Sequence, residues 1–461
     1  MPNAAGSALI HRNDRRAGSR QPGCMWPFYP ELLANPVPRY TSYPTAADFG
    51  ELSPSAYTDA LENTGGEVSL YVHIPFCEKI CHYCGCNTGA AGRRQRLQSY
   101  MAALEREIDT VSALLPRNAR VGRVSFGGGS PNALSSVDFV RLVESLTVAF
   151  RISNAVFSIE LDPRTMSAPC AQAIATVGIE RASLGVQTFA AHCQKAIGRV
   201  QDEDTIVRTV DWLRGAGVTS LNFDLMYGLP GQSEGDLVDT LHRSRVLGAD
   251  RIALFGYAHV PHVVPRQRVI DASNLPDQKA RFAMASLGFS YLCTHGYIPV
   301  GFDHFARAGG DPLAHAALSG HLHRNFQGFT DDAAPFLIGL GASAISQFPH
   351  LIAQNEKNSG RYRMLASQGS LSATRGIVRS ADDLERAAVI EKLLCHGFAD
   401  LSPKLEALVR GPLFPFIDRN LASLRDGHLV VDADGLPYVR SIASLFDTFR
   451  GDQARRFSSA I

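Results

Sequence analysis

Between residues 66 and 300, short apolar runs alternate with longer amphipathic stretches. The short runs are rich in β-branched residues and predict strands at 69–74, 121–126, 156–161, 181–186, 220–226 and 251–257. The longer stretches, which include 97–115, 135–150 and 202–217, place apolar residues at helical spacing. Six strands separated by helices predict βα repeats and a parallel sheet, either as an open twisted sheet or as a partial barrel.

The pattern changes from about residue 301, where apolar helical stretches such as 384–398 dominate. A strand–turn–strand signal follows at 428–439, with Asp434-Gly435 as the expected hairpin turn. We therefore expect three parts: an N-terminal extension at 1–36 that is flexible, an α/β domain with an N-terminal arm at 37–300, and a mostly helical domain at 301–461.

Composition narrows the class of protein. The chain has 461 residues, of which 45% are hydrophobic and 19% charged, and its 45 Lys and Arg nearly balance 44 Asp and Glu. A net charge of +1 argues against a partner such as duplex nucleic acid. No apolar run approaches the ~20 residues that span a bilayer. The start of the chain has no signal-peptide core, so the cytoplasm is the expected compartment.

Four of the nine cysteines lie within ten residues of one another, at 77, 81, 84 and 86. Cys77, Cys81 and Cys84 have the spacing C-x3-C-x2-C directly after the first predicted strand. Three thiolates on so short a loop can hold three corners of a 4Fe–4S cluster and leave one iron open to a small molecule. A structural zinc site is the alternative, but the second Cys/His pair that it normally uses is missing from the sequence. We interpret Cys86 as a supporting thiol, although a fourth ligand or a small packing residue also fits.

Polar residues and glycines gather where the other predicted strands end. The second strand is followed by Gly127-Gly128-Gly129, the third closes with Glu160, Gln187 follows the fourth, Asp224 closes the fifth and Ala258 follows the sixth. In βα barrels the active site forms at the carboxyl ends of the strands. The sequence therefore predicts one site built from all six strand ends.

The cysteine spacing is the signature of the radical S-adenosylmethionine (SAM) enzymes, and the chain resembles the branch formed by the oxygen-independent coproporphyrinogen III oxidases, also called coproporphyrinogen dehydrogenases. The similarity runs through PRYTSYPTA (38–46), DLMYGLPGQ (224–232), GFDHFAR (301–307), HRNFQGF (323–329), GASAIS (341–346) and FDTFR (446–450). It implies a partial (β/α)6 radical SAM barrel and a C-terminal domain that closes the active site.

The resemblance also implies cofactors and their contacts. A 4Fe–4S cluster would be held by Cys77, Cys81 and Cys84, with one SAM on the open iron and a second SAM beside it. Positions matching SAM contacts are Tyr71, Tyr83, Gly127, Gly128, Glu160, Gln187, Arg199, Asp224, Ala258 and Ile345. Phe326 and Gln327 match positions near the second SAM, and Arg39 is the candidate clamp for a substrate propionate. No catalytic side chain is implied beyond the cluster and SAM.

The implied reaction removes a β-hydrogen and CO2 from each of two propionates of coproporphyrinogen III, giving the vinyl groups of protoporphyrinogen IX in heme biosynthesis. An unidentified one-electron donor is required, and a monomer is the expected state. Three alternatives remain open: a heme-binding chaperone with the same cysteine triplet, a radical SAM methyltransferase, and a non-enzymatic metal-binding module. The PRYTSYP block and Cys86 favour the oxidase over the chaperone.

Overall fold

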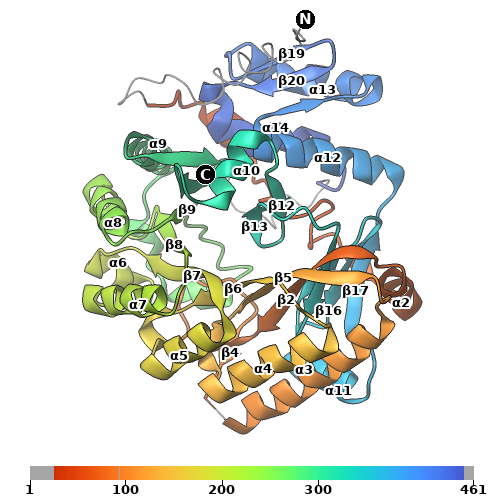
Figure 1. Ribbon diagram of the computed structural model, residues 1–461. Helices are drawn as coiled ribbons and strands as arrows, with labels where there is room; N and C mark the ends of the chain where they lie inside the picture. Colours follow the sequence, from red (N-terminus) through yellow and green to blue (C-terminus); the bar gives the residue numbers. More distant parts are fainter. Residues whose placement is uncertain (1–24, 93, 451–461) are drawn as a thin grey trace, which may run out of the picture. The chain divides into compact units, whose positions relative to one another are not determined.

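The structure is a computed structural model that describes residues 25–92 and 94–450 (Figure 1). The described chain divides into two units. One, the sheet unit, comprises residues 42–275 and 332–385. The other, the second unit, comprises 25–41, 276–331 and 386–450. The expected boundary at 300/301 is therefore replaced by two units that each combine separate stretches of sequence.

Six parallel strands form the main part of the sheet unit, in the order β2-β5-β6-β7-β8-β9. Their bounds are β2 Gly66–Ile74, β5 Ala119–Gly128, β6 Val156–Leu161, β7 Ile179–Gln187, β8 Ser220–Tyr227 and β9 Arg251–Gly256. Each contains most or all of one predicted strand, so the βα prediction is confirmed. Parallel strands covered on both faces are buried along their length, as the run from Val68 to Ile74 shows, with Ser69 and His73 as its two polar members.

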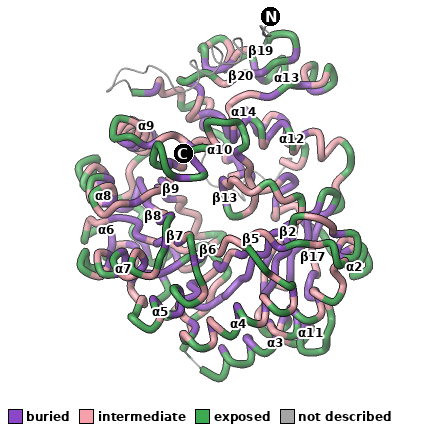
Figure 2. Tube along the Cα trace, in the orientation of Figure 1, coloured by how far each residue is buried: buried purple, intermediate pink, exposed green. Residues whose placement is uncertain are grey.

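Helices connect these strands in sequence order. They are α3 Arg94–Leu114, α4 Ser136–Ala149, α5 Ala168–Val177, α6 Ala191–Ala196, α7 Glu203–Gly215 and α8 Glu234–Val246. Helices α3, α4, α5 and α7 are successive neighbours around the sheet, with their exposed sides turned away from it (Figure 2). Side chains cap several of their first turns; Ser233 and Asp236, for example, form a capping box at the start of α8.

The sheet continues beyond β2 with strands that the sequence analysis did not predict. Strand β14 (Phe336–Leu340) pairs in parallel with β2, on the edge opposite β5. Strands β15 (Ile345–Gln347), β16 (Leu351–Asn355), β17 (Ala373–Val378) and β1 (Gly50–Glu51) follow in antiparallel order, and helices α2 (Pro54–Glu62) and α11 (Ser359–Ser367) belong to the same unit. Residues 332–385 thus complete the sheet instead of belonging to a C-terminal domain.

The second unit combines helices with short antiparallel strands. Its elements are α9 Gln278–Thr294, β10 Tyr297–Val300, β11 His304–Arg307, α10 Pro312–Ser319, β12 His323–Asn325, β13 Gly328–Thr330, β18 Phe398–Asp400, α13 Pro403–Ile417, β19 Ala422–Arg425, β20 His428–Val431 and α14 Val439–Ala443. Helix α12 (Ala381–His396) carries the chain from the sheet unit into it.

The predicted hairpin at 428–439 is misplaced. The turn lies at Asp426-Gly427, between β19 and β20, while Asp434-Gly435 belongs to the 3-10 helix η6 (Ala433–Tyr438). Asp426 and Gly427 have φ values of +49° and +74°. Two successive positive φ values suit the type I′ turn of a two-residue hairpin loop. Asp426-Gly427 and Asp434-Gly435 are both suitable for this turn, so residue type alone does not distinguish them.

The N-terminal segment was expected to be a flexible extension through residue 36, but its described part is packed. Trp26 is buried against Phe282 and Phe289 of α9, with ring centroids 6.4 and 4.8 Å away. Leu33, in the 3-10 helix η1 (Pro30–Leu33), is also buried. Residues 1–24 lie outside the described part of the chain. Among the described helices, none combines the length and apolarity needed to cross a membrane.

Candidate active site

The cysteine loop leaves the carboxyl end of β2 and is closed by backbone pairing. Strand β3 (Phe76–Cys77) pairs with β4 (Gly89–Ala90), so the ends of the loop lie side by side. The amides of Gly129 and Ser130 donate to the carbonyls of Ile74 and Phe76 at 2.8 Å each. These bonds attach the loop to the glycine triplet after β5, so the sheet unit fixes the position of the three cysteines.

Each of the three sulfurs accepts a hydrogen bond. Thr88 Oγ1 donates to Cys77 Sγ at 3.2 Å, and the Cys86 amide donates to Cys84 Sγ at 3.4 Å. Cys81 Sγ accepts from two guanidinium groups, described below. Donors aimed at ligating sulfurs are typical of iron–sulfur sites, where they help to set the reduction potential.

The thiols also differ in how readily they lose a proton. The pKa of Cys84 is lowered to about 6, chiefly by a hydrogen bond with the Cys86 thiol and against the effect of burial. Burial raises the pKa of Cys77. Because only thiolates ligate metal, the loop offers at least one ligand that is ready at neutral pH. All eight described cysteines are free.

The spacing of the sulfurs argues against a single zinc ion. Among the described residues, His192, Cys193 and Asp236 form the group of three whose ligand atoms all lie within 4.8 Å of one another, and the loop cysteines form no such group. Sulfurs bound to one zinc at about 2.3 Å cannot lie more than about 4.6 Å apart. Ligands to separate irons of a cluster can, so this spacing is compatible with a 4Fe–4S group held by Cys77, Cys81 and Cys84. We assign no metal to the His192 group, because Asp236 already caps helix α8.

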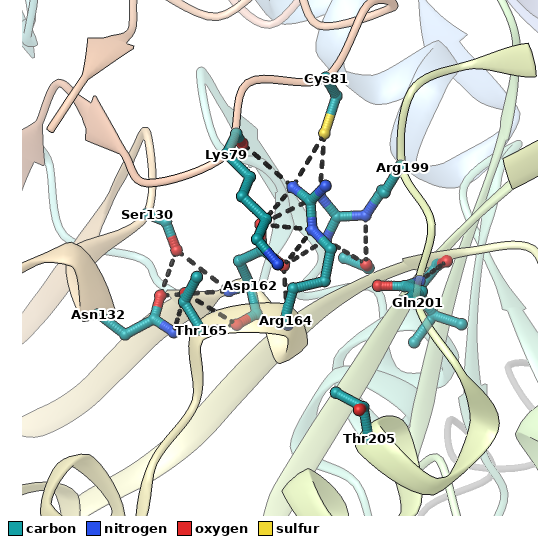
Figure 3. A network of polar contacts seen from close by, with 12 residues as sticks. Lys79, Cys81, Ser130, Asn132, Asp162, Arg164, Thr165, Arg199, Gln201 and Thr205 are labelled. Atoms are coloured by element: carbon teal, nitrogen blue, oxygen red, sulfur yellow. Dashed lines mark hydrogen bonds and ion pairs between the residues drawn. The ribbon is translucent and has the colours of Figure 1, made fainter. Parts of the chain in front are cut away.

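A buried network of charges lies beside Cys81 (Figure 3). The Asp162 carboxylate, two residues after Glu160, is paired with Arg164 at 2.6 Å and with Arg199 at 3.1 Å. Arg164 Nη2 and Arg199 Nη1 each donate to Cys81 Sγ at 3.2 Å. Burial tends to raise the pKa of Asp162, but the two arginines outweigh it and hold the pKa below its usual value. The Cys81 sulfur therefore faces two cations that share one carboxylate.

The glycine triplet brings the backbone close to two side chains. The Gly128 amide donates to Glu160 Oε2 at 3.2 Å, and Gly128 has a φ of +108°. A Cβ at Gly127 would lie 2.7 Å from the Glu160 carboxyl carbon, and one at Gly128 would lie 2.6 Å from the His73 ring. Only glycine permits this approach together with this backbone conformation.

His73 lies under the triplet as a neutral ring. Its Nδ1 is 3.2 Å from the Tyr71 hydroxyl and its Nε2 is 3.2 Å from the Asn87 carbonyl oxygen. Since a carbonyl only accepts, Nε2 carries the proton and Nδ1 accepts from Tyr71. Burial lowers the pKa of His73 to about 4, so the ring supports the loop without adding charge.

Glu160 of β6 and Asp224 of β8 place two carboxylates at strand ends on either side of β7. Glu160 keeps exposed surface, yet protein atoms crowd its carboxyl group. This desolvation, together with the charge of Asp224, raises the pKa of Glu160 to about 7. Asp224 accepts from Ser183 Oγ at 3.0 Å and from Asn222 Nδ2 at 2.8 Å. The pair can hold a cationic amino group or ribose hydroxyls.

The remaining strand ends carry residues fixed by backbone contacts. Gln187 is buried at the end of β7 with a φ of +66°, which is uncommon outside glycine and is concentrated at functional sites. Gln267 Nε2 donates to the Tyr83 carbonyl at 2.9 Å and to the Ala258 carbonyl at 3.0 Å. It thereby ties the cysteine loop to the segment after β9.

Ile345 lies in β15 of the same unit, next to a loop that reaches the site. Its backbone packs on Gly339, where a Cβ would lie 2.5 Å from the Ile345 carbonyl oxygen. Ser343, two residues earlier, has its Oγ 3.5 Å from His73 Nε2. The sheet unit thus contains all three expected cluster ligands and all ten positions expected to contact SAM.

Arg39, Phe326 and Gln327 belong to the second unit. Arg39 Nη1 lies 3.7 Å from Asp303 Oδ2. Phe326 and Gln327 form the turn between β12 and β13, where the Gln327 amide donates to Asn325 Oδ1 at 2.9 Å.

Comparison with known proteins identifies the family. The Radical SAM superfamily matches residues 71–243. The oxygen-independent coproporphyrinogen III oxidase of Bradyrhizobium diazoefficiens is 38% identical, over 89% of this chain and 94% of that protein. The Escherichia coli enzyme of that name is 37% identical, over 92% and 96% of the two chains. The chain belongs to the oxygen-independent coproporphyrinogen III oxidase family.

The solved structure of coproporphyrinogen III oxidase (HemN) from Escherichia coli, described as a radical SAM enzyme, agrees with this membership. It superposes with a TM-score of 0.85 at 34% identity, covering 92% of this chain and all of that one. The partial (β/α)6 barrel expected for a coproporphyrinogen III oxidase is thereby confirmed, and a 4Fe–4S cluster and SAM follow from the family.

Sequence reasoning missed the residues that support this oxidase site. Asp162 and Arg164 follow Glu160 in the string ELDPR, where a second acid directly after a strand end was an available signal. Nothing in the sequence indicates that the Arg164 side chain turns toward Cys81. Gln267 lies in the 3-10 helix η4 (Pro265–Val269), outside every predicted strand end.

Proposed function

We propose that this protein catalyses the oxygen-independent oxidative decarboxylation of two propionates of coproporphyrinogen III, giving protoporphyrinogen IX in heme biosynthesis. The observation that carries the proposal is the similarity to coproporphyrinogen III oxidases along about nine-tenths of both chains. A shared cysteine loop alone would support only the superfamily.

The cofactor contacts remain part of the proposal. Cys77, Cys81 and Cys84 hold the cluster, since each sulfur has a hydrogen-bond donor and none is in a disulfide. When bound, the cluster and SAM supply a radical able to take hydrogen from an unactivated carbon. The SAM positions are those expected from the sequence: Tyr71, Tyr83, Gly127, Gly128, Glu160, Gln187, Arg199, Asp224, Ala258 and Ile345.

The protein's own groups bind and orient the reactants. Glu160 and Asp224 provide negative charge for the amino group of SAM, and Arg199 provides positive charge for its carboxylate. Arg39, whose side chain is 37% exposed, binds a substrate propionate, because a tetracarboxylate needs cationic partners. Phe326 and Gln327 contact a second SAM.

The partners are coproporphyrinogen III and a one-electron donor. The protein acts as a monomer in the cytoplasm, a reducing compartment in keeping with the free cysteines. Near-neutral net charge gives nucleic acid no part in this function.

An anaerobic assay tests the proposal. Protein reconstituted with iron and sulfide is incubated with coproporphyrinogen III, SAM and dithionite, and products are read by mass spectrometry. We expect protoporphyrinogen IX and 5′-deoxyadenosine, both lost in Cys81→Ala and both retained in Cys170→Ala, which removes a free cysteine of α5. SAM cleavage without decarboxylation would reject this substrate. Heme binding without SAM cleavage would indicate a chaperone.

A further inference from the structure

Arg164 is a buried cation with no role in the proposed reaction. It lies in the 3-10 helix η3 (Pro163–Thr165), directly after β6, and its side chain is only 4% exposed. Its Nε donates to both carboxylate oxygens of Asp162, at 3.0 and 3.1 Å. Its Nη2 donates to Asp162, to the Lys79 carbonyl at 3.1 Å and to Cys81 Sγ at 3.2 Å (Figure 3). One guanidinium therefore links the strand end to the cysteine loop at two points.

The carboxylate that holds this guanidinium is itself fixed. The Asp162 amide donates to Ser130 Oγ at 3.1 Å, and its carbonyl accepts from Asn132 Nδ2 at 2.9 Å. The next residue, Pro163, restricts the backbone further. Arg164 has little freedom to move away from Cys81, so its contact with the sulfur is built into the strand end.

The charges beside Cys81 do not cancel. Two guanidinium groups, from Arg164 and Arg199, share the single carboxylate of Asp162. Adding an electron to an iron–sulfur cluster increases negative charge on its sulfurs, and donors to those sulfurs stabilise the reduced form more than the oxidised form. A cation fixed at a ligating sulfur therefore favours reduction.

We propose that Arg164 is a positioning residue which, held by Asp162, donates to the ligating sulfur of Cys81 and raises the reduction potential of the cluster. This inference rests on the proposed role of Cys81 as a cluster ligand. Arg199 makes a similar contact, but it also has a proposed role in binding SAM, so a variant of Arg199 would change both the cluster and SAM binding. A variant of Arg164 changes the contact with Cys81 Sγ without removing a proposed SAM contact.

The test measures the reduction potential of reconstituted full-length protein without substrate. Samples are titrated with dithionite under argon and the reduced cluster is quantified by electron paramagnetic resonance, with iron and sulfide determined in parallel. We expect Arg164→Gln to keep its iron and to be reduced about tenfold less favourably, a fall of about 59 mV for one electron. Arg164→Lys keeps the charge but cannot reach all three acceptors, so its potential should lie between the two.

Arg214→Gln is the matched control. It removes another barrel arginine paired with an aspartate, Asp250, at 2.6 Å, and Arg214 also donates to the Val218 carbonyl ahead of β8. The reduction potential of Arg214→Gln should equal that of the wild type.

The inference would be overturned if the wild type binds iron and both Arg164 variants have the wild-type reduction potential. That result would leave the proposed function intact. If Arg164→Gln takes up no iron, Arg164→Lys decides: a lowered potential supports the inference and a wild-type potential rejects it. If the wild-type protein binds no iron, the proposal that it holds a 4Fe–4S cluster is wrong.

Discussion

The guanidinium of Arg39 lies 3.7 Å from the carboxylate of Asp303, and the two side chains are 37% and 12% exposed. The cation therefore reaches solvent while its partner stays inside the protein. Burial tends to raise the pKa of Asp303, but His304, Arg324 and Arg39 outweigh it and lower the pKa to about 2. The aspartate thus stays charged and orients an arginine that retains exposed surface.

Removing that arginine should weaken substrate binding more than turnover. A charge-assisted hydrogen bond contributes about 1.5–3 kcal/mol, so we expect Arg39→Gln to raise KM for coproporphyrinogen III by roughly tenfold or more with kcat nearly unchanged. Arg39→Lys, which keeps the charge, should lose less. Steady-state kinetics under anaerobic conditions provide the measurement. An unchanged KM in Arg39→Gln would show that this arginine only packs against Asp303.

The stability contributed by Asp303 should depend on pH. Its folded-state pKa is depressed, so the contribution is complete above the unfolded value near 4 and is lost as pH falls toward 2. A shift of that size corresponds to about 2 kcal/mol. Asp303→Asn should unfold at lower guanidinium concentration than the wild type at pH 7, and the gap should narrow between pH 4 and 2. If the difference in stability between the two proteins is the same at pH 7 and at pH 2, the lowered pKa of Asp303 is contradicted.

Glu160 predicts a pH-dependent affinity for SAM. With a pKa raised to about 7 by crowding and by Asp224, its carboxylate gains its charge as pH rises through 7. A cationic amino group should therefore bind more tightly at pH 8 than at pH 6, as calorimetry would show. Glu160→Gln should flatten the profile. Asp224→Asn removes the repelling charge and should move the midpoint of the pH dependence of SAM affinity to lower pH. A midpoint that does not move would show that Asp224 has no effect on the pKa of Glu160.

Metal content should separate Cys86 from its neighbours. Alanine at Cys77, Cys81 or Cys84 removes a proposed ligand, and each variant should lose most of its iron after anaerobic reconstitution. Cys86→Ala removes the thiol that lowers the pKa of Cys84 but keeps the backbone amide that donates to Cys84 Sγ, and it leaves all three proposed ligands in place, so this variant should retain its iron. Iron and sulfide assays with the visible absorption spectrum provide the measurement. Loss of iron in Cys86→Ala would make this residue a ligand.

A second buried carboxylate should matter for stability alone. Glu107 of α3 accepts from the Gly341 amide at 2.6 Å, Asn355 Nδ2 at 2.9 Å, the Tyr362 hydroxyl at 2.7 Å and Ser372 Oγ. Burial raises its pKa although these four donors oppose the effect. Glu107→Gln turns one acceptor into a donor that faces other donors and should cost about 1–3 kcal/mol. Chemical denaturation measures this against Glu105→Gln, whose partner Arg141 is largely exposed.

The sequence predicts the six barrel strands because short apolar runs alternate there with longer amphipathic stretches. Strand β6, for example, spans the predicted 156–161. Strands β14 to β17 lack that alternation, because they follow one another closely and, in this stretch of the described chain, the only helix among them is α11, between β16 and β17. Pairing between Arg39 and Asp303, which are 264 positions apart in the chain, has no local signature at all.

The residues of the site also divide into those that the sequence indicates and those that it does not. Motif spacing identifies the residues that would touch iron or SAM, because that chemistry restricts both residue type and position. Side chains that act through another residue, such as Arg164 on Cys81, depend on rotamers that only the folded chain defines.

The parallel pairing of β14 with β2 has a consequence for biosynthesis. The cysteine loop follows β2, yet the strand that covers the outer edge of β2 begins at Phe336, after the chain has passed through residues 276–331 of the second unit. During translation this edge stays open while about 260 further residues are made, a delay of roughly 13–50 s at 5–20 residues per second. Open strand edges promote aggregation, so a nascent chain stalled before residue 336 should be a preferred substrate for chaperones.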